Sequence, residues 1–209
     1  MIKYFVRTTN ERILDESFSQ INYELIVDTK HQPVISFIDS LEYISDYDSI
    51  LLEDDVILCN DFKERIEQVI SDYPNDIINF FTLPMTYFTT HITDDFFKFN
   101  QCTYYPKGIS KVIAEKMKNH LYENIPYGYD TIEGWSFKEM NLSYLVYRPC
   151  LVQHIDYKSL ISKSHHRRSP YFIDYLEALG IKYEDAKLST NKTKLLNYMN
   201  EKFKDIDKN

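Results

Sequence analysis

One stretch of the chain, residues 49–58, is an apolar run that is interrupted by three consecutive carboxylates, Glu53, Asp54 and Asp55. The apolar and partly β-branched residues before Glu53 are typical of a buried strand in the centre of a parallel sheet. Three unpaired carboxylates cannot all lie in a hydrophobic core, because burying each of them costs several kcal/mol. They therefore either form a solvated acidic turn or hold a cation at the end of the strand. Because hard oxygen ligands favour Mg²⁺ or Mn²⁺, and because apolar residues flank the acids on both sides, the sequence favours a divalent metal site.

Segments with the patterns of strands and of helices alternate around this run. Strands are predicted at residues 2–6, 23–27, 49–52 and 76–82, and the helices between them at residues 11–20, 33–43 and 62–71. Such alternation is typical of a mostly parallel sheet with helices on its faces. Further along the chain, strands are predicted at residues 102–106 and 143–147, and helices at residues 110–121, 130–140, 171–179 and 192–203. The predicted fold class is therefore α/β.

The composition argues against several classes of protein. The chain of 209 residues has only four glycines and neither glycine-rich phosphate-binding motif, which argues against Rossmann dinucleotide enzymes and P-loop NTPases. A formal net charge of −8 argues against broad nonspecific binding to nucleic acids, although it leaves room for a local basic patch. The three cysteines are widely spaced and match neither a disulfide framework nor a zinc site. Since the N-terminus has no signal-peptide pattern and no apolar run reaches transmembrane length, we expect a cytoplasmic protein.

Four motifs follow one another in an order that resembles glycosyltransferases of the GT-A fold, over residues 2–160. They are the acidic run Leu51-Leu52-Glu53-Asp54-Asp55, the segment rich in tyrosine and serine at residues 104–110, Asp130 before a helix, and Pro149-Cys150-Leu151-Val152-Gln153-His154. The last motif is similar to small transferases of the lipopolysaccharide and N-acetylglucosaminyl branching families. The resemblance implies a mostly parallel sheet flanked by helices, with a catalytic domain at residues 1–160. Residues 161–209 would form a basic loop and C-terminal helices that pack on the same domain.

The resemblance also implies a site for Mn²⁺ or Mg²⁺. In this family an acidic, DXD-like motif holds the cation against the diphosphate of a nucleotide-sugar, and a later histidine often completes the metal shell. Asp55 is the expected direct ligand, while Asp54 or Glu53 contacts the ribose or a metal-bound water. His154, at the end of a strand, is the expected second protein ligand, and the alternative is a structural histidine.

Polar residues that follow the first two predicted strands are the candidates for the nucleoside end of the site. Arg7 and Thr8 follow the first strand and Asp28 follows the second, so they should lie opposite the acidic motif at neighbouring strand ends. There we expect them to bind the nucleobase and ribose of the donor. The alternative for Arg7 is an ordinary surface charge.

Asp130 is the candidate general base. An inverting transferase needs one carboxylate near the acceptor hydroxyl to accept its proton. The alternative is that Asp130 caps a helix that begins at Thr131, with Glu133 completing an acidic first turn. One residue can serve both purposes.

A basic run at residues 158–168 is conspicuous in so acidic a chain. Its basic residues are Lys158, Lys163, His165, His166, Arg167 and Arg168. Lys163 and Arg167 either fold over the donor diphosphate or grip a polyanionic acceptor such as a DNA backbone. The alternative is a solvated basic loop.

The predicted function is a metal-dependent glycosyltransferase that moves a sugar from a nucleotide-diphosphate sugar to a hydroxyl acceptor. The acceptor is a glycan or, as in small phage-type transferases, a hydroxymethylated base in DNA. In the second case the base would be flipped out, and Tyr87, Phe88, Phe96 and Phe97 would stack on it unless they belong to the core. Two alternatives stay open, a metal-dependent nucleotidyltransferase and a noncatalytic nucleotide-sugar-binding protein of the same fold.

Overall fold

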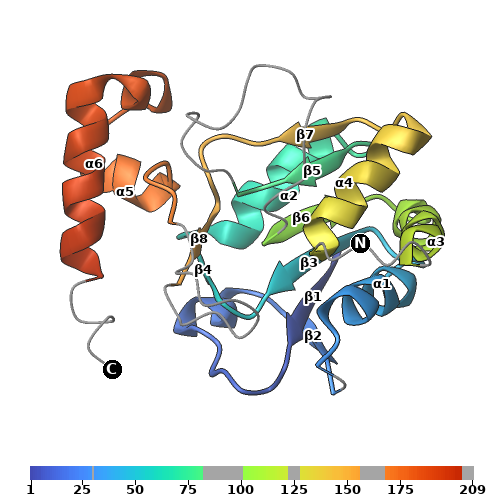
Figure 1. Cartoon of the computed structure of the whole chain (residues 1–209). Coiled ribbons are helices and arrows are strands. Elements are labelled where there is room, and N and C mark those ends of the chain that lie inside the picture. The colour runs from blue at the N-terminus through green and yellow to red at the C-terminus, as the bar shows by residue number, and fades with distance from the viewer. Residues whose placement is uncertain (30, 82–100, 122–127, 156–167, 204–209) are drawn as a thin grey trace.

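The computed structural model describes residues 1–29, 31–81, 101–121, 128–155 and 168–203 (Figure 1). The strands are β1 (Lys3–Thr8), β2 (Tyr23–Val27), β3 (Ser49–Glu53), β4 (Val56–Leu58), β5 (Ile77–Asn79), β6 (Cys102–Tyr105), β7 (Tyr144–Val146) and β8 (Val152–His154). The α-helices are α1 (Pro33–Tyr43), α2 (Phe62–Asp72), α3 (Ile109–Leu121), α4 (Tyr129–Met140), α5 (Ile173–Ala178) and α6 (Ser189–Lys202). Two short 3₁₀ helices are η1 (Glu16–Gln20) and η3 (Tyr183–Lys187). None of the helices in these ranges is both long and apolar enough to cross a membrane.

Six strands form one mixed sheet in the order β2-β1-β3-β6-β5-β7. The pairs β1–β2, β1–β3 and β5–β7 are parallel, whereas β6 pairs antiparallel with both β3 and β5. Five strands therefore run in one direction and β6 runs against them. The predicted α/β fold with a mostly parallel sheet is confirmed at this level, and the arrangement is compatible with a Rossmann-like fold. β3 lies inside the sheet, as expected, although only one of its two neighbours is parallel.

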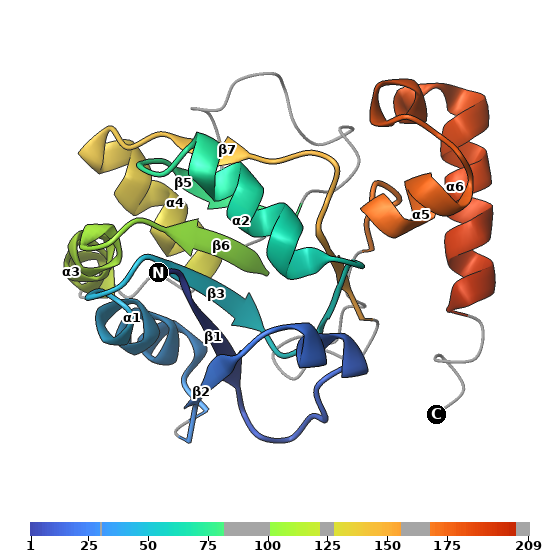
Figure 2. The ribbon, with the colours of Figure 1, turned by 180° about the vertical axis from the view of Figure 1, so that it is seen from behind.

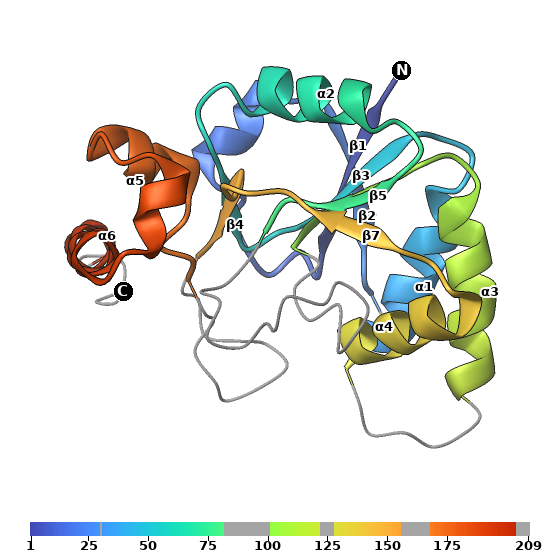
Figure 3. The ribbon, with the colours of Figure 1, turned by 90° about the horizontal axis from the view of Figure 1, so that it is seen from above.

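Helices cover both faces of the sheet because side chains alternate between faces along each strand. Tyr4 and Val6 of β1 belong to a cluster that includes η1 and α2, whereas Phe5 packs with α1, α3 and α4 on the other face. Figure 3 shows α2 on one side of the sheet and α1, α3 and α4 on the other. The two clusters fix the strand ends from both sides.

The first strands create a topological switch point between β1 and β3. From β1 the chain passes through η1 to β2 on one side, then returns through α1 to β3 on the other side of β1. In open α/β sheets, ligands bind in the crevice at such a point, beyond the carboxyl ends of the strands. The acidic residues that follow β3 lie at this edge.

The strand that resumes after the acidic residues does not extend the main sheet. β4 instead pairs antiparallel with β8 in a separate two-stranded ladder, in which Val56 lies opposite His154. Helices α5 and α6 lie beyond this ladder, at one end of the molecule (Figures 1 and 2). Side chains from this C-terminal part join the hydrophobic cluster on the α2 face of the sheet: Tyr171, Phe172, Tyr175, Leu176, Leu195, Met199 and Phe203.

The helix predicted at residues 11–20 is the main local difference from expectation. Only Glu16–Gln20 is helical, as a 3₁₀ turn that Asp15 caps by accepting a hydrogen bond from the Ser17 N–H. Residues 9–15 instead form an irregular loop beside the carboxyl ends of β1 and β3, with Ile13 almost fully exposed. This change matters because the loop carries Arg12.

Candidate active site

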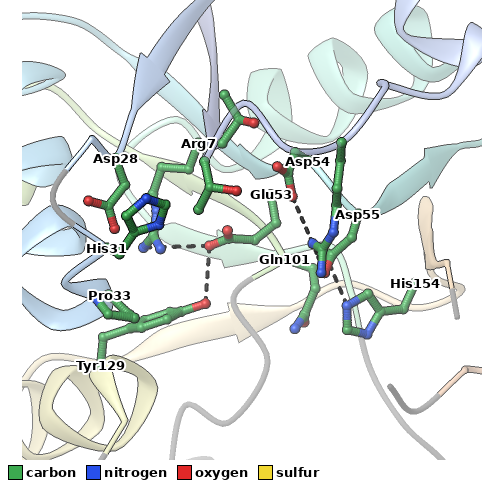
Figure 4. A pocket seen from close by; sticks show the side chains of 13 residues that line it. Arg7, Asp28, His31, Pro33, Glu53, Asp54, Asp55, Gln101, Tyr129 and His154 are labelled. Carbon is green, nitrogen blue, oxygen red and sulfur yellow. Dashed lines mark hydrogen bonds and ion pairs between the residues drawn. The ribbon is translucent and has the colours of Figure 1, made fainter. Parts of the chain in front are cut away.

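A pocket of about 390 Å³ lies at the switch point, where the ends of β1 and β3 meet β8 and the start of α4 (Figure 4). It is lined by Arg7, Thr8, Thr9, Arg12, Asp28, His31, Pro33, Glu53, Asp54, Asp55, Gln101, Tyr129 and His154. Six of these residues, two arginines and four acids, carry charged side chains. Its position is the one that the topology of the sheet favours for a ligand.

Most of the residues proposed from the sequence line this pocket: Arg7, Thr8, Asp28, Glu53, Asp54, Asp55 and His154. Lys163 and Arg167 lie outside the described residues, as do Tyr87, Phe88, Phe96 and Phe97. Arg168 is described, and its guanidinium stacks on the ring of Phe203, 3.8 Å from the centroid, just beyond α6. The basic run therefore keeps its predicted roles as expectations.

Arg7 lies beside Glu53 in the lining of the pocket. It lies opposite Glu53 in the β1–β3 register, with Arg7 Nη1 3.6 Å from Glu53 Oε1. Its guanidinium also lies 5.0 Å from the ring centroid of Phe37 and 4.6 Å from that of Tyr129. Because the residue is only 7% exposed, the alternative of an ordinary surface charge is wrong. Arg7 is a buried cation held by one carboxylate and two aromatic faces.

Burial affects the pKa of Glu53 more strongly than its ion pair with Arg7 does. The Tyr129 hydroxyl donates a 3.3 Å hydrogen bond to Glu53 Oε1, the oxygen that faces Arg7. The pKa of Glu53 is raised from 4.5 to about 7, chiefly by burial; the charges of Asp55 and Asp54 also raise it, whereas Arg7 and the Tyr129 hydroxyl lower it. A group with this pKa changes charge near neutral pH.

We predict that Glu53 makes the stability of the metal-free protein depend on pH. The folded state raises the pKa of Glu53. Protonated Glu53 therefore contributes fully to the free energy of unfolding below pH 4.5, and this contribution is lost as the pH rises through about 7. Between about pH 5 and pH 8 the free energy of unfolding in chelator should fall by about 1–3 kcal/mol more in the wild type than in Glu53→Gln.

Chemical denaturation at the two pH values measures this difference. Glu177→Gln is the matched control, because Glu177 is half exposed and pairs with Arg65 outside the pocket. Equal pH dependence in the wild type and in Glu53→Gln would contradict a raised pKa at this position.

Asp54 and Asp55 share a single guanidinium, that of Arg12. Arg12 Nη1 donates to Asp54 Oδ1 at 2.9 Å and to Asp55 Oδ2 at 2.7 Å, and all three side chains are close to buried. The other oxygen of Asp54, Oδ2, is buried and accepts no hydrogen bond from the described residues. Buried polar atoms are nearly always satisfied, so this oxygen has the character of an open ligand position.

His154 meets Asp55 through the β4–β8 ladder. The Ile155 N–H donates to the Asp55 carbonyl at 2.8 Å, which places His154 Nε2 3.2 Å from Asp55 Oδ1. The edge of the imidazole also packs against the ring of Phe81. The imidazole is thus placed either to coordinate a cation beside Asp55 or to orient that carboxylate.

The donor chemistry at the acidic pair fits a hard divalent cation. Two carboxylates and an imidazole converge there, and Asp54 Oδ2 is unsatisfied. As the side chains stand, with Arg12 between the carboxylates, no group of three or more His, Cys, Asp or Glu within the described ranges is arranged to hold a metal. Asp54, Asp55 and His154 would therefore hold the predicted Mn²⁺ or Mg²⁺ after Arg12 has moved.

Replacing His154 should reveal its part in cation binding. We predict that His154→Gln lowers the affinity for Mn²⁺ by about tenfold or more, whether the imidazole coordinates the ion or orients Asp55. Calorimetric titration measures the affinity. The control is His120→Gln, another buried histidine, which lies in α3 and outside the pocket. Unchanged Mn²⁺ affinity together with lower thermal stability would assign His154 a structural role only.

The start of α4 excludes one of the two interpretations of Asp130. The helix begins at Tyr129 with Gly128 at the N-cap, so the alternative in which Asp130 caps a helix beginning at Thr131 is wrong. Glu133 is not part of an exposed acidic turn, because it is fully buried and accepts a 2.7 Å hydrogen bond from the Tyr105 hydroxyl. Asp130 lies in the first turn of α4, next to the pocket residue Tyr129, and its role as a base stays a prediction.

The sequence interpretation missed several residues that line the pocket: Thr9, Arg12, His31, Pro33, Gln101 and Tyr129. Arg12 was assigned to a helix, and nothing in the surrounding residues distinguishes it from a surface arginine. Tyr129 was the one with a usable signal, because it directly precedes Asp130 in Tyr127-Gly128-Tyr129-Asp130 and begins a helix that faces the strand ends.

A scan against protein-family models finds no family that matches this chain, and a search of curated proteins finds no relative of it.

Proposed function

We propose that this protein is a glycosyltransferase that uses a nucleotide-diphosphate sugar and a divalent cation, Mn²⁺ or Mg²⁺. The observation that carries the proposal is the pocket at the β1–β3 switch point, in which the carboxylate pair Asp54–Asp55 has an unsatisfied buried oxygen. The mixed, mostly parallel sheet supports it, as does the convergence of Arg7, Asp28 and the acidic motif on one cavity.

The pocket has two halves with different chemistry. In Figure 4, Asp28, His31, Pro33 and Tyr129 lie on one side of Glu53, and Asp54, Asp55 and His154 lie on the other. Asp54, Asp55 and His154 would hold the cation. A divalent ion bound there would stabilise the negative charge that develops on the departing nucleoside diphosphate. The acidic half therefore suits the diphosphate end of the donor.

The other half suits the nucleoside. Asp28 offers carboxylate oxygens that accept hydrogen bonds from ribose hydroxyls or base N–H groups. The ring of Tyr129 already stacks on Phe37, with centroids 4.7 Å apart, and the pair holds Arg7 in place. In this half the chain orients the donor, and Asp130 in the first turn of α4 is the group proposed to accept the proton of the acceptor hydroxyl.

A panel of nucleotide-sugars tests the proposal. Each is incubated with the protein and Mn²⁺, and the products of slow donor hydrolysis are identified. Release of a nucleoside diphosphate such as UDP or GDP supports a glycosyltransferase. Release of pyrophosphate supports a metal-dependent nucleotidyltransferase instead. Tight binding without any release supports a noncatalytic binding protein.

A second measurement distinguishes a DNA acceptor from a glycan acceptor. A DNA acceptor requires backbone contacts that weaken as salt rises, whereas a glycan hydroxyl does not. Binding to duplex DNA is therefore measured against salt for the wild type and for a variant in which Lys163, Arg167 and Arg168 are all alanine. Salt-dependent binding that the variant loses assigns the basic run to DNA. Absence of binding at low salt leaves the glycan as the acceptor class.

A further inference from the structure

Arg12 occupies the position between the two carboxylates that the proposed cation would take. One guanidinium nitrogen, Nη1, reaches both Asp54 and Asp55, at 2.9 Å and 2.7 Å. The guanidinium thereby supplies the positive charge that two adjacent, nearly buried carboxylates require. We propose that Arg12 is an exchangeable counter-ion: it holds the acidic pair in the metal-free protein and leaves when a divalent cation binds. This inference rests on the proposed metal site but does not depend on the reaction.

Charge repulsion prevents the Arg12 guanidinium and the divalent ion from occupying the acidic pair at the same time. Asp54 and Asp55 would hold a divalent ion on the same carboxylates that Arg12 now contacts, and two cations on one carboxylate pair repel strongly in a partly buried site. An ion in the position between the carboxylates would displace Arg12 Nη1 from Asp54 Oδ1 and Asp55 Oδ2, even where the open oxygen Asp54 Oδ2 is one of its ligands. Binding of the ion therefore includes the cost of breaking two charge-assisted hydrogen bonds, which lowers the apparent affinity of the wild type.

The loop at residues 9–15, which carries Arg12, can rearrange so that Arg12 leaves the acidic pair. Residues 9–15 contain no regular secondary structure, and Ile13 within them is 88% exposed. Local hydrogen bonds fix both ends of the loop: the Asn10 N–H donates to Thr8 Oγ1 at 2.8 Å, and Asp15 caps η1. Between these anchors, the loop contacts the rest of the molecule through Arg12 on the acidic pair, through Leu14 against the hydrophobic core, and through the exposed pair of Glu11 with His31. Because Asn10, Glu11 and Ile13 are exposed and the loop has no regular secondary structure, a local rearrangement around Arg12 costs little free energy.

The arrangement has a functional consequence for selectivity. A monovalent cation brings the same charge as Arg12 and gains nothing by replacing it, whereas a divalent ion adds one positive charge beside Glu53, Asp54 and Asp55. Arg12 therefore keeps the acidic pair closed to common monovalent ions. It also couples occupation of the metal site to release of the loop at residues 9–15.

The first test compares Mn²⁺ affinity, measured by calorimetry, in the wild type, Arg12→Gln and Arg12→Lys. Removal of the competing charge should tighten Mn²⁺ binding by about tenfold or more in Arg12→Gln, while Arg12→Lys, which keeps the charge, should stay close to the wild type. Arg65→Gln is the control, because Arg65 pairs with Glu177 outside the pocket. Equal or weaker Mn²⁺ binding in Arg12→Gln overturns the proposal, as does absence of binding in both proteins.

A second measurement uses only the wild type, and it tests the release of Arg12 even if Arg12→Gln does not fold. Amide hydrogen exchange is followed at residues 9–15 with and without saturating Mn²⁺. Release of Arg12 should speed exchange in this loop while α2 stays unchanged. Unchanged or slower exchange in the loop overturns the proposal. If no nucleotide-sugar were bound or hydrolysed, the proposed reaction would be refuted. The Mn²⁺ titration and the hydrogen-exchange measurement would still test the role of Arg12.

Discussion

Replacing Asp55 by asparagine should reduce both Mn²⁺ binding and Mn²⁺-dependent donor hydrolysis by at least about a hundredfold. Asparagine keeps the volume of the side chain but removes the charge that now meets Arg12 at Oδ2 and His154 at Oδ1. The loss should be large because Asp55 is the only residue of the acidic pair that also contacts His154 among the described ion pairs. Calorimetry and a nucleoside-diphosphate release assay measure the two effects.

The control for this substitution is Asp61→Asn. Asp61 is exposed, lies outside the pocket and has a positive φ of 54°, which asparagine tolerates well. It should leave both measurements unchanged. Wild-type Mn²⁺ affinity in Asp55→Asn, or undiminished hydrolysis in excess chelator, would refute the metal assignment.

Replacing Arg7 by methionine should destabilise the fold by about 3–5 kcal/mol at alkaline pH, because it leaves Glu53 buried without its cation. Methionine roughly keeps the volume of the side chain beside the stacked rings of Phe37 and Tyr129, so the loss reports mainly on charge. The cost should be smaller near pH 5, since Glu53, whose pKa is about 7, is then protonated and needs no partner. Urea denaturation at both pH values measures the difference.

A double substitution separates charge from packing at this pair. Arg7→Met combined with Glu53→Gln should recover more than about 1 kcal/mol of the loss at alkaline pH, because neither charge is then left alone. Lys3→Met is the control: it breaks the exposed pair Lys3–Glu24 and should change the stability far less than either pocket substitution. Additive effects of the two pocket substitutions would mean that Arg7 acts through packing alone.

Much of the fold follows from local pattern. The segments 23–27 and 33–43 were predicted with the bounds that the structure shows, because a short run of β-branched and apolar residues and a proline at the helix start are strong local signals. The direction of a strand is not such a signal. β6 has the composition of any buried strand, and only its neighbours make it antiparallel. The separation of β4 from β3 is likewise decided by its partner β8, far along the chain.

In the candidate site, too, some residues could be located from local sequence and others only from tertiary packing. Its carboxylates could be located because three acids inside an apolar run conflict with burial, and a conflict of that kind points to function. Arg7, Asp28 and His154 could be located because they follow predicted strands. Arg12 could not, since its importance comes from a loop that replaces a predicted helix and brings it onto Asp54 and Asp55. Contacts of this kind arise from tertiary packing.

The β4–β8 ladder gives the site a firm support and one point of fragility. The pairing of Val56 with His154 is made by backbone groups, and Val56, Leu58 and Val152 belong to the hydrophobic core, so an apolar substitution of similar size in these strands leaves Asp55 beside the imidazole. A change in length is different. One residue inserted into Val152–His154 would shift the register by one and turn His154 to the opposite face of the ladder. The length of both strands is therefore as strict a requirement of the site as the identity of its side chains.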